Sequence, residues 1–443
     1  MIPNPTRVLI RGGRLIDPAS GVDSVSDLAI VDGRVAEIGS GLDAAPATEV
    51  IDAEGLLVLP GLVDPHVHLR EPGGEHKETI ASGSAAAAAG GFTTVAAMPN
   101  TSPAIDHPAM VRFVEQRGRE AGRCRVRVVG AATPGRRGER AADIRSMRSA
   151  GAVAFSDDGD VIASAGVMSA VLGAVHQAGA VFMQHCQEPT LTPNAAMHAG
   201  EISVRMGVPG WPRAAEEVIV ERDLRLNRGI GCRYHAQHLS SAGSIDLIRS
   251  ARARGEPVTG EASPHHLHLT DEICLSEDGH GLNTLGKVNP PVREASDVRA
   301  LRQAVADGVV TILGTDHAPH AAHEKALPFE EAPFGMIGLE FAVPLYAEAL
   351  VESGAIGWPR LVELLTVEPT RLLGLEDEGV GRLRVGDAAD VTLYDPAHEW
   401  TIEPDALSGR SANTPFLGRS VRGRAIKTLL AGAVVSDRLA ERA

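Results

Sequence analysis

Short apolar runs alternate with helical stretches through the middle of the chain. Helical patterns cover residues 77–89, 108–122 and 141–150. Strands that alternate with helices indicate parallel βα units, and eight such units predict a (β/α)₈ barrel of the TIM type. The eight runs with the length and composition of buried strands are 61–66, 92–98, 125–130, 153–156, 180–185, 233–238, 258–262 and 310–315.

The two ends of the chain show a different pattern, with short alternating runs and turn residues. Gly12-Gly13 and Asp32-Gly33 interrupt the runs near the start, and Asp-Gly between two such runs is a strong hairpin signal. Strand-like runs return near residues 389–393 and 425–430. We predict that residues 1–58 and 380–443 pair into one small β domain, beside a barrel formed by residues 59–379.

Charge, hydropathy and cysteine spacing limit which partners and which cellular location are expected. The net charge of −15 argues against nucleic acid or an anionic membrane as a partner. No apolar stretch is long enough to span a bilayer, and the first residues lack the pattern of a signal peptide. The four cysteines are scattered without a Cys-x-x-Cys pair, which is typical of reduced thiols. We therefore expect a cytoplasmic protein.

Histidines and aspartates follow the predicted strands at the point where each strand ends. His66 and His68 stand at alternate positions, so both side chains can reach one metal ion. The active site of this barrel type lies at the carboxyl ends of its strands. Those ends carry His66, His68, Asp157, Asp158, His185, His238 and Asp316.

This set of side chains predicts a two-metal site. Four histidines with two or three carboxylates match the ligand preferences of zinc and exceed what one tetrahedral ion needs. Two ions can activate water and polarise a carbonyl, which suits hydrolysis of an amide. The sequence alone permits either Asp157 or Asp158 as the ligand from strand four, and His317 is expected to point away from the site. A buried histidine hydrogen-bonded in the core is the alternative for any single member.

Six short motifs extend over nearly the whole chain and carry a resemblance to a known family. The motifs are DPHVHLREPG (64–73), MPNT (98–101), AFSDDG (154–159), SPHH (263–266), NPP (289–291) and GTDHAPH (314–320). With them the chain resembles the long class of bacterial dihydroorotases, which are cyclic amidohydrolases of the amidohydrolase superfamily. This resemblance implies reversible closure of N-carbamoyl-L-aspartate to L-dihydroorotate and water, a step of de novo pyrimidine biosynthesis.

The resemblance also assigns roles to residues. It implies two Zn²⁺ per subunit with Asp158 bridging them, and Asp316 as the proton shuttle for a hydroxide held between the ions. The first zinc would be held by His66, His68, Asp158 and Asp316, and the second by Asp158, His185 and His238. The substrate would be bound by His68, Arg70, Asn100, Asn289, His320 and the backbone of Phe334 and Gly335. We also expect self-association and an association with aspartate carbamoyltransferase.

Two further expectations concern the loops around the site. Many two-metal amidohydrolases use a carbamylated lysine at strand four, but no lysine lies between Lys77 and Lys287, so a carboxylate must take its place. Gly159 is expected to let the backbone approach the metals. Residues 320–336 lack periodicity, and we predict that they form an active-site lid.

Three alternatives stay open at this point. A hydantoinase, dihydropyrimidinase or allantoinase would share the barrel and the metals, although Arg70 favours a ring that carries a carboxylate. A catalytically silent relative would serve only as a scaffold for a partner such as the carbamoyltransferase. A generic metal-binding protein would have no reason to place Arg70 and Asn100 beside the metal ligands.

Overall fold

A barrel of eight parallel strands forms the centre of the structure, a computed structural model that describes residues 7–44 and 48–442. All eight predicted strands are confirmed, and they follow one another around the barrel in chain order. The strands are β6 (Leu62–Val67), β7 (Phe92–Ala97), β8 (Arg125–Ala131), β9 (Ala154–Ser156), β10 (Val181–Gln184), β13 (Arg233–Ala236), β14 (Val258–Ala262) and β15 (Ile312–Leu313).

Polar contacts close the barrel between its last and first strands. The carboxylate of Asp64 on β6 accepts hydrogen bonds from Thr315 beyond β15, at 2.6 Å from the hydroxyl and 3.2 Å from the backbone nitrogen. The backbone nitrogen of His68 donates to the carbonyl oxygen of His317 over 2.9 Å. These bonds place the ends of β6 and β15 next to each other, so residues that are distant in sequence meet at one rim.

Helices cover the outside of the barrel, as the repeat predicts. Thr79 caps helix α1 (Ile80–Ala89) by accepting a hydrogen bond from the backbone nitrogen of Ser82. The small alanines of α1 let this helix pack closely on the strands. The helices are α1 (Ile80–Ala89), α2 (Pro108–Ala121), α3 (Ile144–Ser149), α4 (Ala165–Gln177), α6 (Ala214–Asn227), α7 (Ala242–Ala253), α9 (Ala295–Ala306), α11 (Ala342–Tyr346), α12 (Trp358–Leu365) and α13 (Val367–Leu373). Shorter elements on the loops are β11 (Met197–His198), α5 (Glu201–Met206), β12 (Gly210–Trp211), α8 (Pro264–His268) and α10 (Ala322–Lys325).

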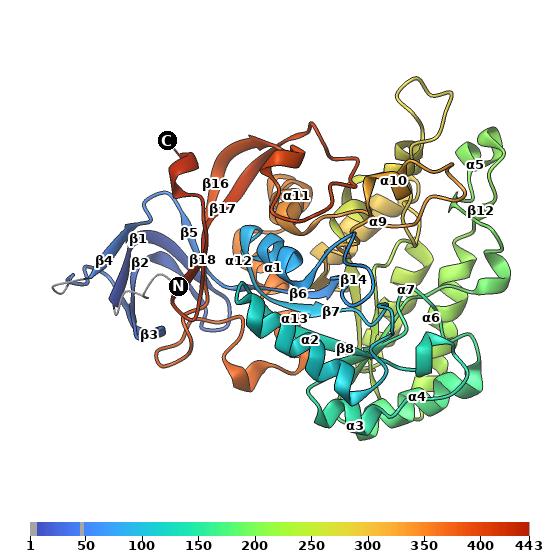
Figure 1. Cartoon of the computed structure of the whole chain (residues 1–443), viewed down its shortest axis with the longest axis horizontal. Coiled ribbons are helices and arrows are strands. Elements are labelled where there is room, and N and C mark those ends of the chain that lie inside the picture. The colour runs from blue at the N-terminus through green and yellow to red at the C-terminus, as the bar shows by residue number, and fades with distance from the viewer. Residues whose placement is uncertain (1–6, 45–47, 443) are drawn as a thin grey trace.

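Strands from both chain ends form a second sheet at one end of the molecule, where the blue and red segments of Figure 1 lie side by side. The two ends join where β5 pairs antiparallel with β16. The predicted hairpin is confirmed, since β2 and β3 pair across Asp32 and Gly33, both at positive φ. The strands are β1 (Arg7–Asp17), β2 (Val22–Val31), β3 (Arg34–Gly39), β4 (Glu49–Asp52), β5 (Leu57–Pro60), β16 (Val391–Thr401), β17 (Ser420–Leu430) and β18 (Ala433–Asp437).

One detail of the sequence interpretation is wrong. Gly12-Gly13 does not separate two strands, because β1 runs through both glycines and only its pairing register with β2 shifts there. Gly12 supports the bulge with a φ of 73°, which favours glycine. At Gly13 an added Cβ would lie 2.4 Å from a methyl group of Val58. The glycines therefore bend one strand instead of ending it.

The described part of the chain contains no helix that is long and apolar enough to cross a membrane.

Candidate metal centre

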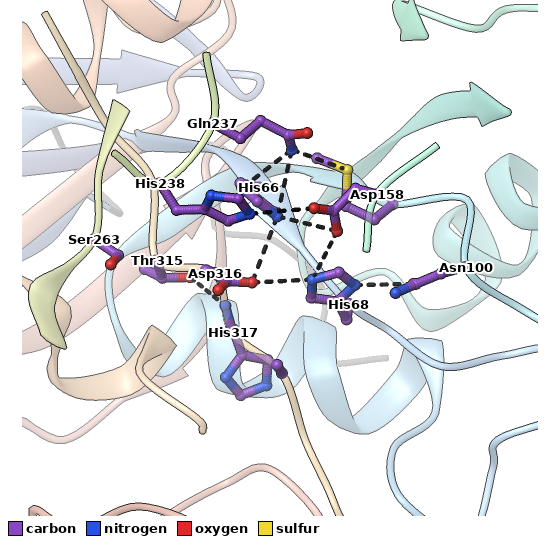
Figure 2. A network of polar contacts seen from close by, with 12 residues as sticks. His66, His68, Asn100, Asp158, Gln237, His238, Ser263, Thr315, Asp316 and His317 are labelled. Atoms are coloured by element: carbon purple, nitrogen blue, oxygen red, sulfur yellow. Dashed lines mark hydrogen bonds and ion pairs between the residues drawn. The ribbon is translucent and has the colours of Figure 1, made fainter. Parts of the chain in front are cut away.

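The six predicted ligands stand at five strand ends and meet in one buried cluster at the carboxyl rim of the barrel. Figure 2 shows five of them: His66, His68, Asp158, His238 and Asp316. The two carboxylate oxygens of Asp158 face different histidines. Oδ2 lies 3.5 Å from Nε2 of His66 and 3.4 Å from Nε2 of His68. Oδ1 lies 3.3 Å from both Nδ1 of His185 and Nε2 of His238. Each oxygen therefore belongs to one of two neighbouring groups of ligand atoms, as a bridging carboxylate requires.

Asp316 joins the first of these groups. Its Oδ1 lies 3.0 Å from Nε2 of His68 and 3.5 Å from Nε2 of His66. Burial raises the pKa of Asp316, but the nearby histidines outweigh burial and hold that pKa below its usual range. The next residue behaves as expected, since Figure 2 shows the ring of His317 directed away from the cluster.

The structure separates the two aspartates that the sequence left open. Asp157 turns away from the cluster and accepts hydrogen bonds from Thr133, one of them 3.0 Å from the backbone nitrogen and another from the hydroxyl. This geometry favours Asp158 as the ligand. The role expected of Gly159 finds no support, because an added Cβ there would meet no atom within 4 Å.

The first pair of histidines is held in orientation by buried hydrogen bonds. Nδ1 of His66 lies 2.8 Å from Oε1 of Glu261, a fully buried side chain on β14, so Nε2 is left to face the carboxylates. Nδ1 of His68 lies 2.9 Å from Oδ1 of Asn100, which has the same effect. Such hydrogen bonds fix the tautomer of a metal-binding histidine and raise its basicity. The donor set and its surroundings therefore fit two divalent ions such as zinc.

Three residues at this rim have a strained backbone. Positive φ angles, which are uncommon outside glycine, occur at His238 (30°), Asp316 (48°) and Arg70 (61°), all in or beside the cluster, and at four other described non-glycine residues: Asp32, Arg136, Asn194 and Ala431. Such conformations cost of order 1–3 kcal/mol each and persist only where surrounding contacts impose them. The strain is consistent with a site built for function.

The cationic side chain of Arg70 lies beside the first group of candidate ligands. Arg70 donates from Nε to the carbonyl oxygen of Pro319 over 3.1 Å, and its Nη2 lies 3.2 Å from Nε2 of His320. Burial lowers the pKa of Arg70 to about 10, so this side chain remains cationic at neutral pH. Burial, with Arg70 and Lys77 nearby, lowers the pKa of His320 to about 2, so its ring is neutral. Asn100 turns its oxygen toward His68, which leaves its NH₂ group available to an anion.

The remaining predicted substrate contacts lie on two loops. Nδ2 of Asn289 donates to Oε1 of Gln187 over 3.2 Å, while Oδ1 of Asn289 is buried and no described residue contacts it by a hydrogen bond. Both backbone groups of Gly335 already have protein partners, because its nitrogen donates to Lys287 and its oxygen accepts from Asn413. Gly335 therefore shapes this loop in addition to any contact with a ligand.

Two buried lysines donate hydrogen bonds to the backbone in and beside the loop predicted as a lid. Lys325 donates from Nζ to the carbonyl oxygens of Thr284 and Pro333, at 2.9 and 2.8 Å. Lys287 donates to the carbonyl oxygen of Phe329 over 2.6 Å. These bonds attach the backbone of Phe329 and Pro333 to buried side chains, and movement of the loop stays a prediction.

Sequence reasoning missed two residues that hold the metal ligands in place. Glu261 was hidden inside an apolar strand, although a charged residue in a buried strand is itself a signal of a specific partner. Gln187 stands two residues after His185 on the loop that leaves β10, and no motif pointed to it. The histidines of the SPHH motif, by contrast, fit the predicted supporting role: His266 lies 3.0 Å from the carbonyl oxygen of Pro290, next to Asn289.

The chain is similar to known proteins over nearly its whole length. A family model described as dihydro-orotase-like matches residues 55–244. The chain is 44% identical to a dihydroorotase of Pelobacter propionicus over 97% of the chain and 100% of that protein. It is 45% identical to a dihydroorotase of Pelotomaculum thermopropionicum, over 97% of the chain and 98% of that protein.

Solved structures of cyclic amidohydrolases share the complete fold. An L-hydantoinase (dihydropyrimidinase) from Arthrobacter aurescens superposes with a TM-score of 0.84 at 25% identity, over 97% of this chain and 96% of its own. A D-hydantoinase (dihydropyrimidinase) from a Thermus species also gives 0.84 at 25% identity, over 97% and 95% of the two chains. Since each superposition covers 97% of this chain, it includes both the barrel and the second sheet.

Proposed function

Because the chain belongs to the dihydroorotase family, we propose that it catalyses the reversible closure of N-carbamoyl-L-aspartate to L-dihydroorotate and water. The observation that carries this choice is Arg70, a partly buried cation beside His68. Hydantoin and dihydropyrimidine rings without a carboxylate would leave such a charge unpaired, at a cost in binding. A dihydroorotate carboxylate would pair with it through two parallel hydrogen bonds.

We assign the metal cofactor to two Zn²⁺ ions. His66, His68, Asp158 and Asp316 would hold one ion, and Asp158, His185 and His238 the other. When bound there, the ions would activate water and polarise the carbonyl under attack. The separation of the two Asp158 oxygens between two pairs of histidines supports this arrangement.

The side chains of this chain would then bind the substrate and move the proton. Arg70, Asn100 and the neutral ring of His320 would hold the substrate carboxylate, and Asn289 the ring. In hydrolysis the ionised Asp316 would accept a proton from the attacking water and deliver it to the ring nitrogen as the carbon–nitrogen bond breaks. In synthesis Asp316 would take that proton back from the nitrogen. The protonated Asp316 would then give it to the departing oxygen, so that water leaves.

A substrate panel with metal analysis tests this function. Purified protein should open dihydroorotate and close carbamoyl aspartate, should act much more slowly on hydantoin and allantoin, and should contain two zinc ions per chain. Arg70→Gln should lose the preference for dihydroorotate while keeping both metals. Preferred turnover of hydantoin or allantoin would contradict the proposal. Absence of turnover in protein with both metals bound would favour the silent scaffold instead.

Self-association, association with aspartate carbamoyltransferase and a cytoplasmic location stay predictions.

A further inference from the structure

A short series of side-chain amides connects the second metal group to the proposed substrate site. Oε1 of Gln187 lies 3.2 Å from Nε2 of His185 on one side and 3.2 Å from Nδ2 of Asn289 on the other. Nε2 of Gln187 donates to the hydroxyl of Thr192 over 2.8 Å. One oxygen atom thus contacts both a proposed metal ligand and a proposed substrate contact.

The hydrogen-bond direction along this series follows from the histidine. Nδ1 of His185 is the ring atom that faces Asp158, at 3.3 Å, so a metal there must use the lone pair of Nδ1. The proton of the neutral ring then sits on Nε2, and the Gln187 atom opposite it must be an acceptor. Because Oε1 fills that position, the NH₂ group of Gln187 is directed to Thr192.

The same oxygen fixes the orientation of the next amide. Asn289 must present its NH₂ group to Oε1 of Gln187, since two amide oxygens at that separation would repel each other. Its own Oδ1 is thereby turned the other way, where it is buried without a hydrogen-bond partner among the described residues. A buried acceptor without a partner costs free energy unless a ligand supplies a donor.

We propose that Gln187 is a positioning residue that makes Asn289 an acceptor for a ring N–H of the substrate while it fixes the metal-binding tautomer of His185. This inference rests on the proposed function and deepens it, because it names the group that the site recognises. A cyclic ureide with a free N–H supplies the missing donor, whereas an N-methylated ring places a methyl group against Oδ1. A site built to accept a hydrogen bond can reject an analogue that lacks the donor by a factor on the order of 10⁴.

Two variants at one position separate this role from simple packing. Gln187→Glu keeps oxygen acceptors toward both His185 and Asn289, whereas Gln187→Leu removes them at similar size. Gln303→Leu is the matched control, because Gln303 is exposed on α9 and donates only to Asp307 at the surface. Zinc affinity would be measured by equilibrium dialysis, and ligand selectivity by competition between dihydroorotate and its two ring N-methyl derivatives.

The two readouts should change together. Gln187→Leu should bind the second zinc about 10- to 100-fold more weakly, the usual effect of losing a partner of a metal-binding histidine. It should also lose at least tenfold of the preference for dihydroorotate over the rejected methyl derivative, while Gln187→Glu and Gln303→Leu keep both properties. If Gln187→Leu keeps its zinc affinity and selectivity, or if Gln187→Glu loses them equally, the inference is wrong. If the unsubstituted protein does not bind dihydroorotate, the proposed function is wrong instead. The zinc affinity of Gln187→Leu would still test whether Gln187 fixes the tautomer of His185.

Discussion

Replacement of Glu261 tests how far the metal centre depends on one buried carboxylate. Glu261 accepts hydrogen bonds from the ring of His66 over 2.8 Å, from the ring of His235 over 3.2 Å and from the backbone nitrogen of His238 over 3.1 Å. Glu261→Leu leaves all three donors buried without an acceptor. At about 1–3 kcal/mol for each buried unsatisfied group, the free energy of unfolding should fall by roughly 3–9 kcal/mol.

Glu261→Gln is the informative partner of that variant. Its amide oxygen can still accept from His66 and from the backbone of His238, and its NH₂ group can donate to His235, whose other ring nitrogen lies 2.8 Å from the hydroxyl of Thr259. Only the charge that raises the basicity of His66 is lost. Zinc affinity should therefore fall about 10- to 100-fold, or about 1.4–2.7 kcal/mol, while unfolding changes far less than in Glu261→Leu.

Competitive zinc titration and chemical denaturation of the metal-free protein measure these two quantities separately. Parental zinc affinity in Glu261→Gln would refute the reasoning that the carboxylate tunes the ligand. Equal losses of unfolding free energy in both variants would show that hydrogen bonding contributes little and that the charge dominates.

Three further results are expected. Arg70→Ala should lose about 2–5 kcal/mol of substrate binding, measured by calorimetry, with unchanged zinc content; near-normal affinity would reject its pairing with the carboxylate. Asp158→Ala should lose the second zinc first and Asp157→Asn should keep both, and reconstitution followed by atomic absorption should not depend on bicarbonate; a bicarbonate requirement would point to a carbamylated lysine. Ring closure converts two carboxylates into one and consumes a proton, so synthesis should gain as the pH falls. Hydrolysis needs ionised Asp316, whose depressed pKa keeps it charged at neutral pH, so initial rates in the two directions should show opposite pH trends, and parallel profiles would exclude Asp316 as the shuttle.

The fold could be predicted from the sequence because its signals are local. Most barrel strands are short apolar runs bounded by turns, and eight of them alternating with helices are typical of the (β/α)₈ barrel. The shift at Gly12 could not be predicted, because a glycine pair reads equally well as a turn or a bulge. Residues 402–419, which join β16 to β17, could not be placed either, because their sequence shows no helix or strand periodicity. In the structure Asn413 of this segment donates a hydrogen bond to the carbonyl oxygen of Ala318, on the loop after β15.

The residues of the candidate site could likewise be predicted only where the signal is local in the sequence. The histidines of the candidate metal site could be predicted because they stand where strands end, and the common rim brings them together. Asp157 and Asp158 could not be separated, since one backbone rotation decides which carboxylate faces the histidines and which faces Thr133. Glu261 and Gln187 act only through other side chains, so their importance depends on distances that a sequence does not contain.

Diffraction from crystals grown with zinc and dihydroorotate, recorded at the zinc absorption edge, tests the central claim most directly. Two anomalous peaks should flank Asp158, one next to His66 and His68 and the other next to His185 and His238, with the ligand carboxylate against Arg70. A single peak, metal bound away from Asp158, or a carboxylate directed away from Arg70 would contradict the account.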